Sequence, residues 1–161
     1  MSAAPQVLVA GIGNIFFGDD GFGVEVARRL AAIELPPSVR VSDFGIRGLH
    51  LALEMLEREY DTTIFVDAVQ HGVRPGTVSL IEPDAASSSD PLDAHGMTPA
   101  TVLSTLAALG GAGGRILIVG CEPERIDEGI GLSPAVAGAV DRAVRLVLEQ
   151  VHAAVHEQKG S

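Results

Sequence analysis

An apolar segment that ends directly in a glycine-rich turn constrains the fold of this chain more than any other feature. Residues 7–23 read VLVAGIGNIFFGDDGFG, an apolar run followed by the turn and then by the beginning of a helical pattern. A fully apolar strand that passes through such a turn into a helix is typical of an open α/β sheet covered on both faces. The turn also carries two adjacent carboxylates, Asp19 and Asp20, to the start of the helix.

Strand and helix patterns alternate along the rest of the chain. The expected strands cover residues 6–10, 39–43, 62–68, 76–82 and 115–120, and the expected helices cover 21–34, 48–58, 98–109 and a last stretch from 133. The turn HGVRPG is too short for a crossover helix, so the strand after it is expected to pair antiparallel to its predecessor, at an edge. The order predicts a three-layer α/β/α fold with a mostly parallel five-stranded sheet, one antiparallel edge strand and helices on both faces.

Length and composition favour one folded domain. The 161 residues, 47% of them hydrophobic, are expected to form a single domain over 1–161 with a frayed tail at about 157–161. No apolar run reaches about 18 residues and the N-terminus has no basic region, so neither a membrane span nor a signal peptide is expected. The single cysteine, Cys121, favours a reducing cytoplasm. The net charge of −10 makes nucleic acid a poor partner. A monomer is expected by default.

Two further residues are candidates to join Asp20 at the carboxyl edge of the sheet. Asp67 ends the apolar run TIFVDAV, and His95 lies in the polar segment LDAHGMTP. Open α/β sheets bind ligands at the edge where the carboxyl ends of parallel strands meet. A carboxylate that ends a buried strand is unfavourable without a partner, and a second carboxylate beside it raises one pKa by repulsion. A divalent cation resolves that conflict, so Asp20 and Asp67 are predicted metal ligands. The expected topology adds His95 to them, and the three residues form the predicted metal-binding and catalytic site.

Two carboxylates and one imidazole suit Ni²⁺, Zn²⁺ or Mn²⁺. Three protein ligands leave positions open, which is typical of a transient or catalytic ion. His71 is a rival or a fourth ligand, and Asp19 is a candidate for a supporting role. Cys121 follows a strand beside the expected site, where a small buried thiol is the commoner interpretation. Asp20 also has a simpler explanation, because an acid before a helix caps free backbone N–H groups.

Other motifs fit the sequence less well. Gly11 and Gly13 match two glycines of a dinucleotide fingerprint, but Phe16 occupies the third position and the adjacent acids would repel a pyrophosphate. A phospho-acceptor receiver domain needs a lysine after its last strand, whereas the single lysine here is Lys159 in the tail. The chain also lacks H-E-x-x-H and G-x-S-x-G, which excludes the standard zinc-protease and serine-hydrolase arrangements.

Six segments together resemble the hydrogenase maturation endopeptidases, which trim the C-terminal extension from the large subunit of nickel–iron hydrogenases. In chain order they are GIGNIFFGDDGFG, SDFGIRGLHLAL, FVDAV followed by RPGTV, AHGMTP, VGCEPE and GIGLSPAV. The metal-binding carboxylates and the imidazole of that family fall on Asp20, where some members have Glu, and on Asp67 and His95. The resemblance implies a peptidase whose partner is the large-subunit precursor and whose Ni²⁺ is transient, carried by that precursor and not held permanently.

The resemblance leaves the chemistry open. The ion either acts as a Lewis acid on the scissile carbonyl or serves only in recognition of the substrate. In the first case an unliganded carboxylate serves as the base that activates water. Residues 83–94 are a candidate for choosing the hydrogenase partner. Two other functions stay as alternatives, namely a noncatalytic nickel-dependent binding partner or chaperone of the large subunit, and a general metal-dependent peptidase.

Overall fold

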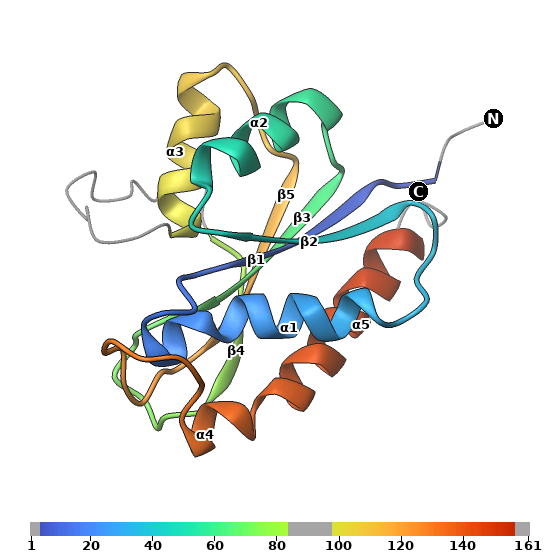
Figure 1. Cartoon of the computed structure of the whole chain (residues 1–161). Helices are drawn as coiled ribbons and strands as arrows, with labels where there is room; N and C mark the ends of the chain where they lie inside the picture. Colours follow the sequence, from blue (N-terminus) through green and yellow to red (C-terminus); the bar gives the residue numbers. More distant parts are fainter. Residues whose placement is uncertain (1–3, 84–97, 157–161) are drawn as a thin grey trace.

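The computed structural model describes residues 4–83 and 98–156, and its strands form one five-stranded sheet in the order β2–β1–β3–β5–β4 (Figure 1). Neighbouring strands are parallel except for β4, which runs antiparallel to β5. The strands are β1 (Val7–Ile12), β2 (Val39–Gly45), β3 (Thr62–Ala68), β4 (Val78–Ile81) and β5 (Arg115–Cys121). The mostly parallel sheet with one antiparallel edge strand confirms the predicted fold class.

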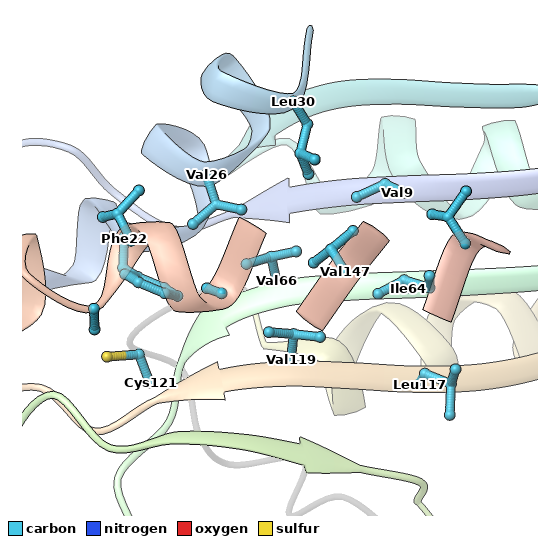
Figure 2. Close-up of a cluster of buried hydrophobic side chains, with 14 of the residues drawn as sticks. Val9, Phe22, Val26, Leu30, Ile64, Val66, Leu117, Val119, Cys121 and Val147 are labelled. Atoms are coloured by element: carbon cyan, nitrogen blue, oxygen red, sulfur yellow. The ribbon is translucent and has the colours of Figure 1, made fainter. Parts of the chain in front are cut away.

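Helices cover both faces of the sheet, which explains why every residue of β1 is buried. Alternate residues of a strand point to opposite faces, so Val9 packs toward one layer and Leu8 toward the other. Figure 2 shows the core on the side of Val9, in which Val66 and Val119 of the sheet lie close to Val147. The helices on this side are α1 (Phe22–Ala31), α4 (Pro134–Ala137) and α5 (Val140–His156), and those on the other side are α2 (Gly48–Arg58) and α3 (Pro99–Ala108).

Two glycines allow α1 to lie directly against the sheet. A Cβ atom added at Gly23 would lie 2.0 Å from the carbonyl oxygen of Val66, and one at Gly11 would lie 2.3 Å from the carbonyl oxygen of Gly23. Close helix–strand packing is the task of the third glycine in a dinucleotide fingerprint. Here Gly23 provides it from the helix itself, so Phe16 does not obstruct the packing and is exposed.

The edge strand β4 has a different partner from the one expected. It pairs with β5, with Val78 opposite Cys121 and Ile81 opposite Ile118, and not with its predecessor β3. The reason is that β3 already has β1 on one side and β5 on the other, so it has no free edge. The expectation of an antiparallel edge strand is confirmed, and the expected neighbour is wrong.

Two helices also differ from the sequence expectation. The first begins at Phe22, after a short 3₁₀ turn η1 (Gly18–Gly21), and it ends at Ala31, three residues before its expected end at residue 34. The last stretch is two helices, because α4 ends at Ala137 and α5 starts at Val140. The helix α3 follows its expected start, with Thr98 in a reciprocal capping box and Pro99 at the first position. None of the described helices is long and apolar enough to cross a membrane.

Candidate active site

Asp20 and Asp67 come together at the carboxyl edge of the sheet, as predicted. Asp67 lies near the end of β3 and Asp20 lies in η1, and the charge of Asp20 acts on the Asp67 carboxyl. Gly13 lies between them, because a Cβ atom added there would be 1.9 Å from the carbonyl oxygen of Asp20 and 3.7 Å from Oδ1 of Asp67. The backbone N–H of Asn14 donates a hydrogen bond of 2.8 Å to Oδ2 of Asp20. The absence of a side chain at Gly13 therefore leaves room for the backbone of Asp20 close to the Asp67 carboxylate.

The environment of Asp67 opposes its ionisation. The residue is 4% exposed. Burial raises the pKa of its carboxyl well above the usual range, the charge of Asp20 raises it further, and a hydrogen bond from the backbone of Ala68 lowers it. A carboxylate in this position is stabilised by any cation that enters the site, so the chemistry of the pair fits a positively charged guest.

His95, the third predicted ligand, lies outside the described residues, as do residues 84–94 of the segment expected to choose the partner. Among the residues that the structure does describe, no group of three or more His, Cys, Asp or Glu side chains could hold a metal ion. The structure thus brings together two of the three predicted ligands. The side chain of His71 is exposed, and its backbone N–H is the group that bonds within the fold.

Asp19 points to a different part of the molecule from its neighbour Asp20. Its carboxylate is 0% exposed and accepts four hydrogen bonds from the loop between β5 and α4. The donors are the backbone N–H groups of Glu124 (2.8 Å), Arg125 (3.0 Å) and Ser133 (2.7 Å) and the hydroxyl of Ser133 (2.8 Å). Burial alone would raise the pKa of Asp19, but these hydrogen bonds outweigh burial and lower the pKa.

Ser133 precedes the helix α4 but its side chain bonds elsewhere. It holds the N-cap position of α4 and Pro134 follows it, but its side chain caps no backbone group of the helix. Its hydroxyl donates to Asp19 instead. The sequence signal located the helix start correctly, and the competing buried carboxylate was not visible from local sequence.

Glu122 is a second anchoring carboxylate, and the sequence analysis gave it no role. Its Oε1 accepts hydrogen bonds from the backbone N–H groups of His71 (2.7 Å) and Val73 (3.3 Å), and these bonds, His71 first, hold the pKa of Glu122 below its ordinary value. Beside it, burial and then the charge of Asp19 raise the pKa of the Cys121 thiol to about 11. That thiol is buried and stays protonated at neutral pH, which confirms the interpretation of Cys121 as a core residue.

A surface hollow of about 340 Å³ lies between η1 and the loop that Asp19 anchors. Its lining includes Gly18, Ser133 and the acidic residues Glu124, Asp127 and Glu128. The loop is joined to η1 by backbone hydrogen bonds from Gly18 to Gly129 (2.8 Å) and from Asp19 to Arg125 (3.1 Å). The lining includes neither Asp20 nor Asp67, so this hollow is distinct from the carboxylate pair.

Known proteins with the same architecture are maturation proteases. The family model for hydrogenase maturation proteases, HycI, matches residues 24–150. A putative hydrogenase maturation protease of Methanocaldococcus jannaschii is 33% identical over 91% of this chain and 96% of its own length. The hydrogenase expression/formation protein HupD of Rhodobacter capsulatus is 36% identical over 92% of this chain and 72% of its own.

Solved structures agree with these sequence matches. The hydrogenase maturating endopeptidase HybD from Escherichia coli superposes with a TM-score of 0.76 at 28% identity, covering 91% of this chain and 92% of its own. An endopeptidase from Escherichia coli has a TM-score of 0.79 at 31% identity, covering 95% of this chain and 93% of its own. With its family model, its relatives and its fold in agreement, this chain is a peptidase that belongs to the hydrogenase maturation protease family.

Proposed function

We propose that this peptidase removes the C-terminal extension of a nickel–iron hydrogenase large-subunit precursor after nickel has been inserted. The observation that carries the proposal is the pairing of Asp20 with the buried Asp67 at the carboxyl edge of the sheet. Two carboxylates so placed repel each other, and a divalent cation carried in by the substrate removes that repulsion. The enzyme then engages only those precursors that bring the ion.

Asp20 and Asp67 supply oxygen ligands to the nickel of the precursor, and His95 supplies an imidazole. Carboxylate oxygens and imidazole nitrogen are a donor set that nickel accepts. A carboxylate oxygen that does not bind the ion takes a proton from the water that attacks the scissile carbonyl. A carboxylate placed beside the reacting water is a suitable general base for that step.

The test is cleavage of nickel-loaded and nickel-free precursor, followed by mass spectrometry of the large subunit. We expect the mass of the C-terminal peptide to disappear from the loaded precursor alone. Equal cleavage of both precursors would contradict recognition of nickel. Asp67→Asn is expected to cut neither, whereas Tyr60→Phe, which removes a hydrogen bond to Glu54 from a residue just before the start of β3, is expected to cut like the parent.

The same experiment separates the alternatives. A noncatalytic nickel-dependent partner would bind the loaded precursor without changing its mass, and membership of a protease family favours the peptidase. A general metal-dependent peptidase would cut unrelated peptides when Ni²⁺ is added. We expect no such cleavage, because in this proposal the ion comes with the substrate.

A further inference from the structure

We infer that Asp19 is a positioning residue for this reaction, which fixes the orientation of Asp20 by fastening η1 to the loop between β5 and α4. The inference rests on the proposed function only in taking Asp20 as the carboxylate that meets the substrate. That loop, residues 122–133, is called here the anchor loop. Asp19 does not meet the substrate itself, because it is fully buried and both of its carboxylate oxygens accept hydrogen bonds from the anchor loop.

The two aspartates are mechanically linked because they are consecutive residues of one tight turn. In a 3₁₀ turn successive side chains leave the axis about 120° apart, so neighbours face different parts of the structure. Asp19 faces the anchor loop, and Asp20 faces Asn14 and Asp67. A rotation of η1 that releases Asp19 therefore also moves the Asp20 carboxylate.

Four hydrogen bonds from the anchor loop converge on the Asp19 carboxylate. Ser133 donates to both oxygens of Asp19, its N–H to Oδ1 and its hydroxyl to Oδ2. Glu124 and Arg125 add two N–H donors to Oδ2. Donors from both ends of the anchor loop thus bind one carboxylate, so the position of the anchor loop is coupled to the position of η1. Hydrogen bonds to a charged group are also stronger than those between neutral groups.

Graded variants test this link. Ser133→Ala removes one of the four hydrogen bonds, and Ser133→Thr keeps the hydroxyl. Asp19→Asn is more severe, because one of its two terminal groups becomes an NH₂ that must face an N–H or O–H donor in either orientation. Tyr60→Phe is the matched control, since it also removes a buried hydrogen bond to a carboxylate but does so away from the site.

The first readout is hydrogen exchange at the amide of Asn14, which donates to Asp20 and reports its position without any substrate. We expect Asn14 to lose protection in Asp19→Asn and, less so, in Ser133→Ala, but not in Ser133→Thr or Tyr60→Phe. The second readout is kinetics on the precursor. We expect kcat to fall about 10–100-fold in Asp19→Asn, as for other residues that orient a metal ligand, and about 3–10-fold in Ser133→Ala, with KM within about threefold of the parent.

The inference is overturned if the amides of Glu124 and Arg125 lose protection while Asn14 keeps it and kcat is unchanged, because Asp19 then holds only the loop. A rise in KM with unchanged kcat would also overturn it. If Asp19→Asn does not fold, the comparison of Ser133→Ala with Ser133→Thr, by the same exchange and kinetic measurements, decides whether the inference holds. If the parent cuts no precursor, the proposed function fails, and the exchange at Asn14 still decides whether Asp19 positions Asp20.

Discussion

The surroundings of Asp19 and Asp67 differ sharply, although both side chains are almost completely buried at the same edge of the sheet. The loop after β5 gives Asp19 three backbone N–H groups and a hydroxyl, and its pKa falls below the ordinary value. Asp67 is buried beside another acid, and its pKa rises well above that value. Burial is common to both sites, so the direction of the shift is decided by the partners.

This difference separates a carboxylate that the fold satisfies from one that it leaves unsatisfied. The charge of Asp19 is balanced by the protein itself, and removing that charge damages the fold. The charge of Asp67 is favoured by a hydrogen bond from the backbone of Ala68 but opposed by burial and by Asp20, and in the proposed function a cation that arrives with the substrate balances it. Replacing the two residues should therefore have opposite effects on stability, although either replacement is expected to lower activity.

The largest effect is expected from Asp67→Asn on cleavage. Loss of a carboxylate that contacts the substrate and accepts a proton is expected to reduce kcat/KM for the nickel-loaded precursor by about 10²–10⁴-fold. Mass spectrometry of the large subunit over time measures the rate, with Tyr60→Phe as the control. Activity within threefold of the parent would show that Asp67 takes no part in the reaction. The contrast between Asp19 and Asp67 would then have no bearing on catalysis.

Stability should change in opposite directions at the two sites. Asp19→Ala leaves the N–H groups of Glu124, Arg125 and Ser133 without their acceptor and is expected to destabilise the protein by about 3 kcal/mol or more. Asp67→Asn replaces a carboxyl whose ionisation the site opposes and is expected to stabilise the free enzyme by about 1 kcal/mol. Urea unfolding at pH 7 measures both. Destabilisation by both variants would show that Asp67 is as well satisfied as Asp19.

The pH dependence of these differences has a definite sign. The folded pKa of Asp67 is raised, so its destabilising effect is present at neutral pH and disappears as the pH falls below its usual 3.8. The folded pKa of Asp19 is lowered, so its stabilisation is complete above 3.8 and is lost only in stronger acid. Between pH 7 and pH 4 we expect the Tm advantage of Asp67→Asn to shrink and the deficit of Asp19→Ala to stay. A constant advantage would contradict the raised pKa.

The smallest effect is expected from Ser133→Ala, which removes a single hydrogen bond to Asp19. A loss of about 1–2 kcal/mol is expected, or a decrease in Tm of roughly 2–8 °C. Differential scanning calorimetry against Ser133→Thr measures it. An unchanged Tm would show that the three N–H donors alone satisfy Asp19.

Much of this architecture follows from local sequence. The ranges of α2 and β3 agree with the pattern to the residue, because apolar periodicity and the flanking polar residues act locally. The pairing of Asp20 with Asp67 was also predictable, since parallel strands share one carboxyl edge. The partner of β4 was not, because it depends on which strands already have two neighbours.

The roles of Asp19 and Glu122 depend on contacts with residues remote in sequence. Asp19 meets Ser133 across 114 positions, and Glu122 meets His71 across 51. No spacing rule covers contacts of this kind. The pair of adjacent acids in the turn was a visible signal, but only the fold shows that one faces inward to a loop and the other faces Asp67.

The contact between α1 and the sheet at Gly23 has a consequence for anyone who wishes to redirect this protease to another substrate. A methyl group there would meet the Val66 carbonyl at 2.0 Å, one residue before Asp67, and would displace the helix, the turn or the strand end. Engineering tolerance is therefore unevenly distributed. Exposed positions such as Ile126 and Ile130 can be randomised in a library, whereas Gly23 at the start of α1 has to be kept.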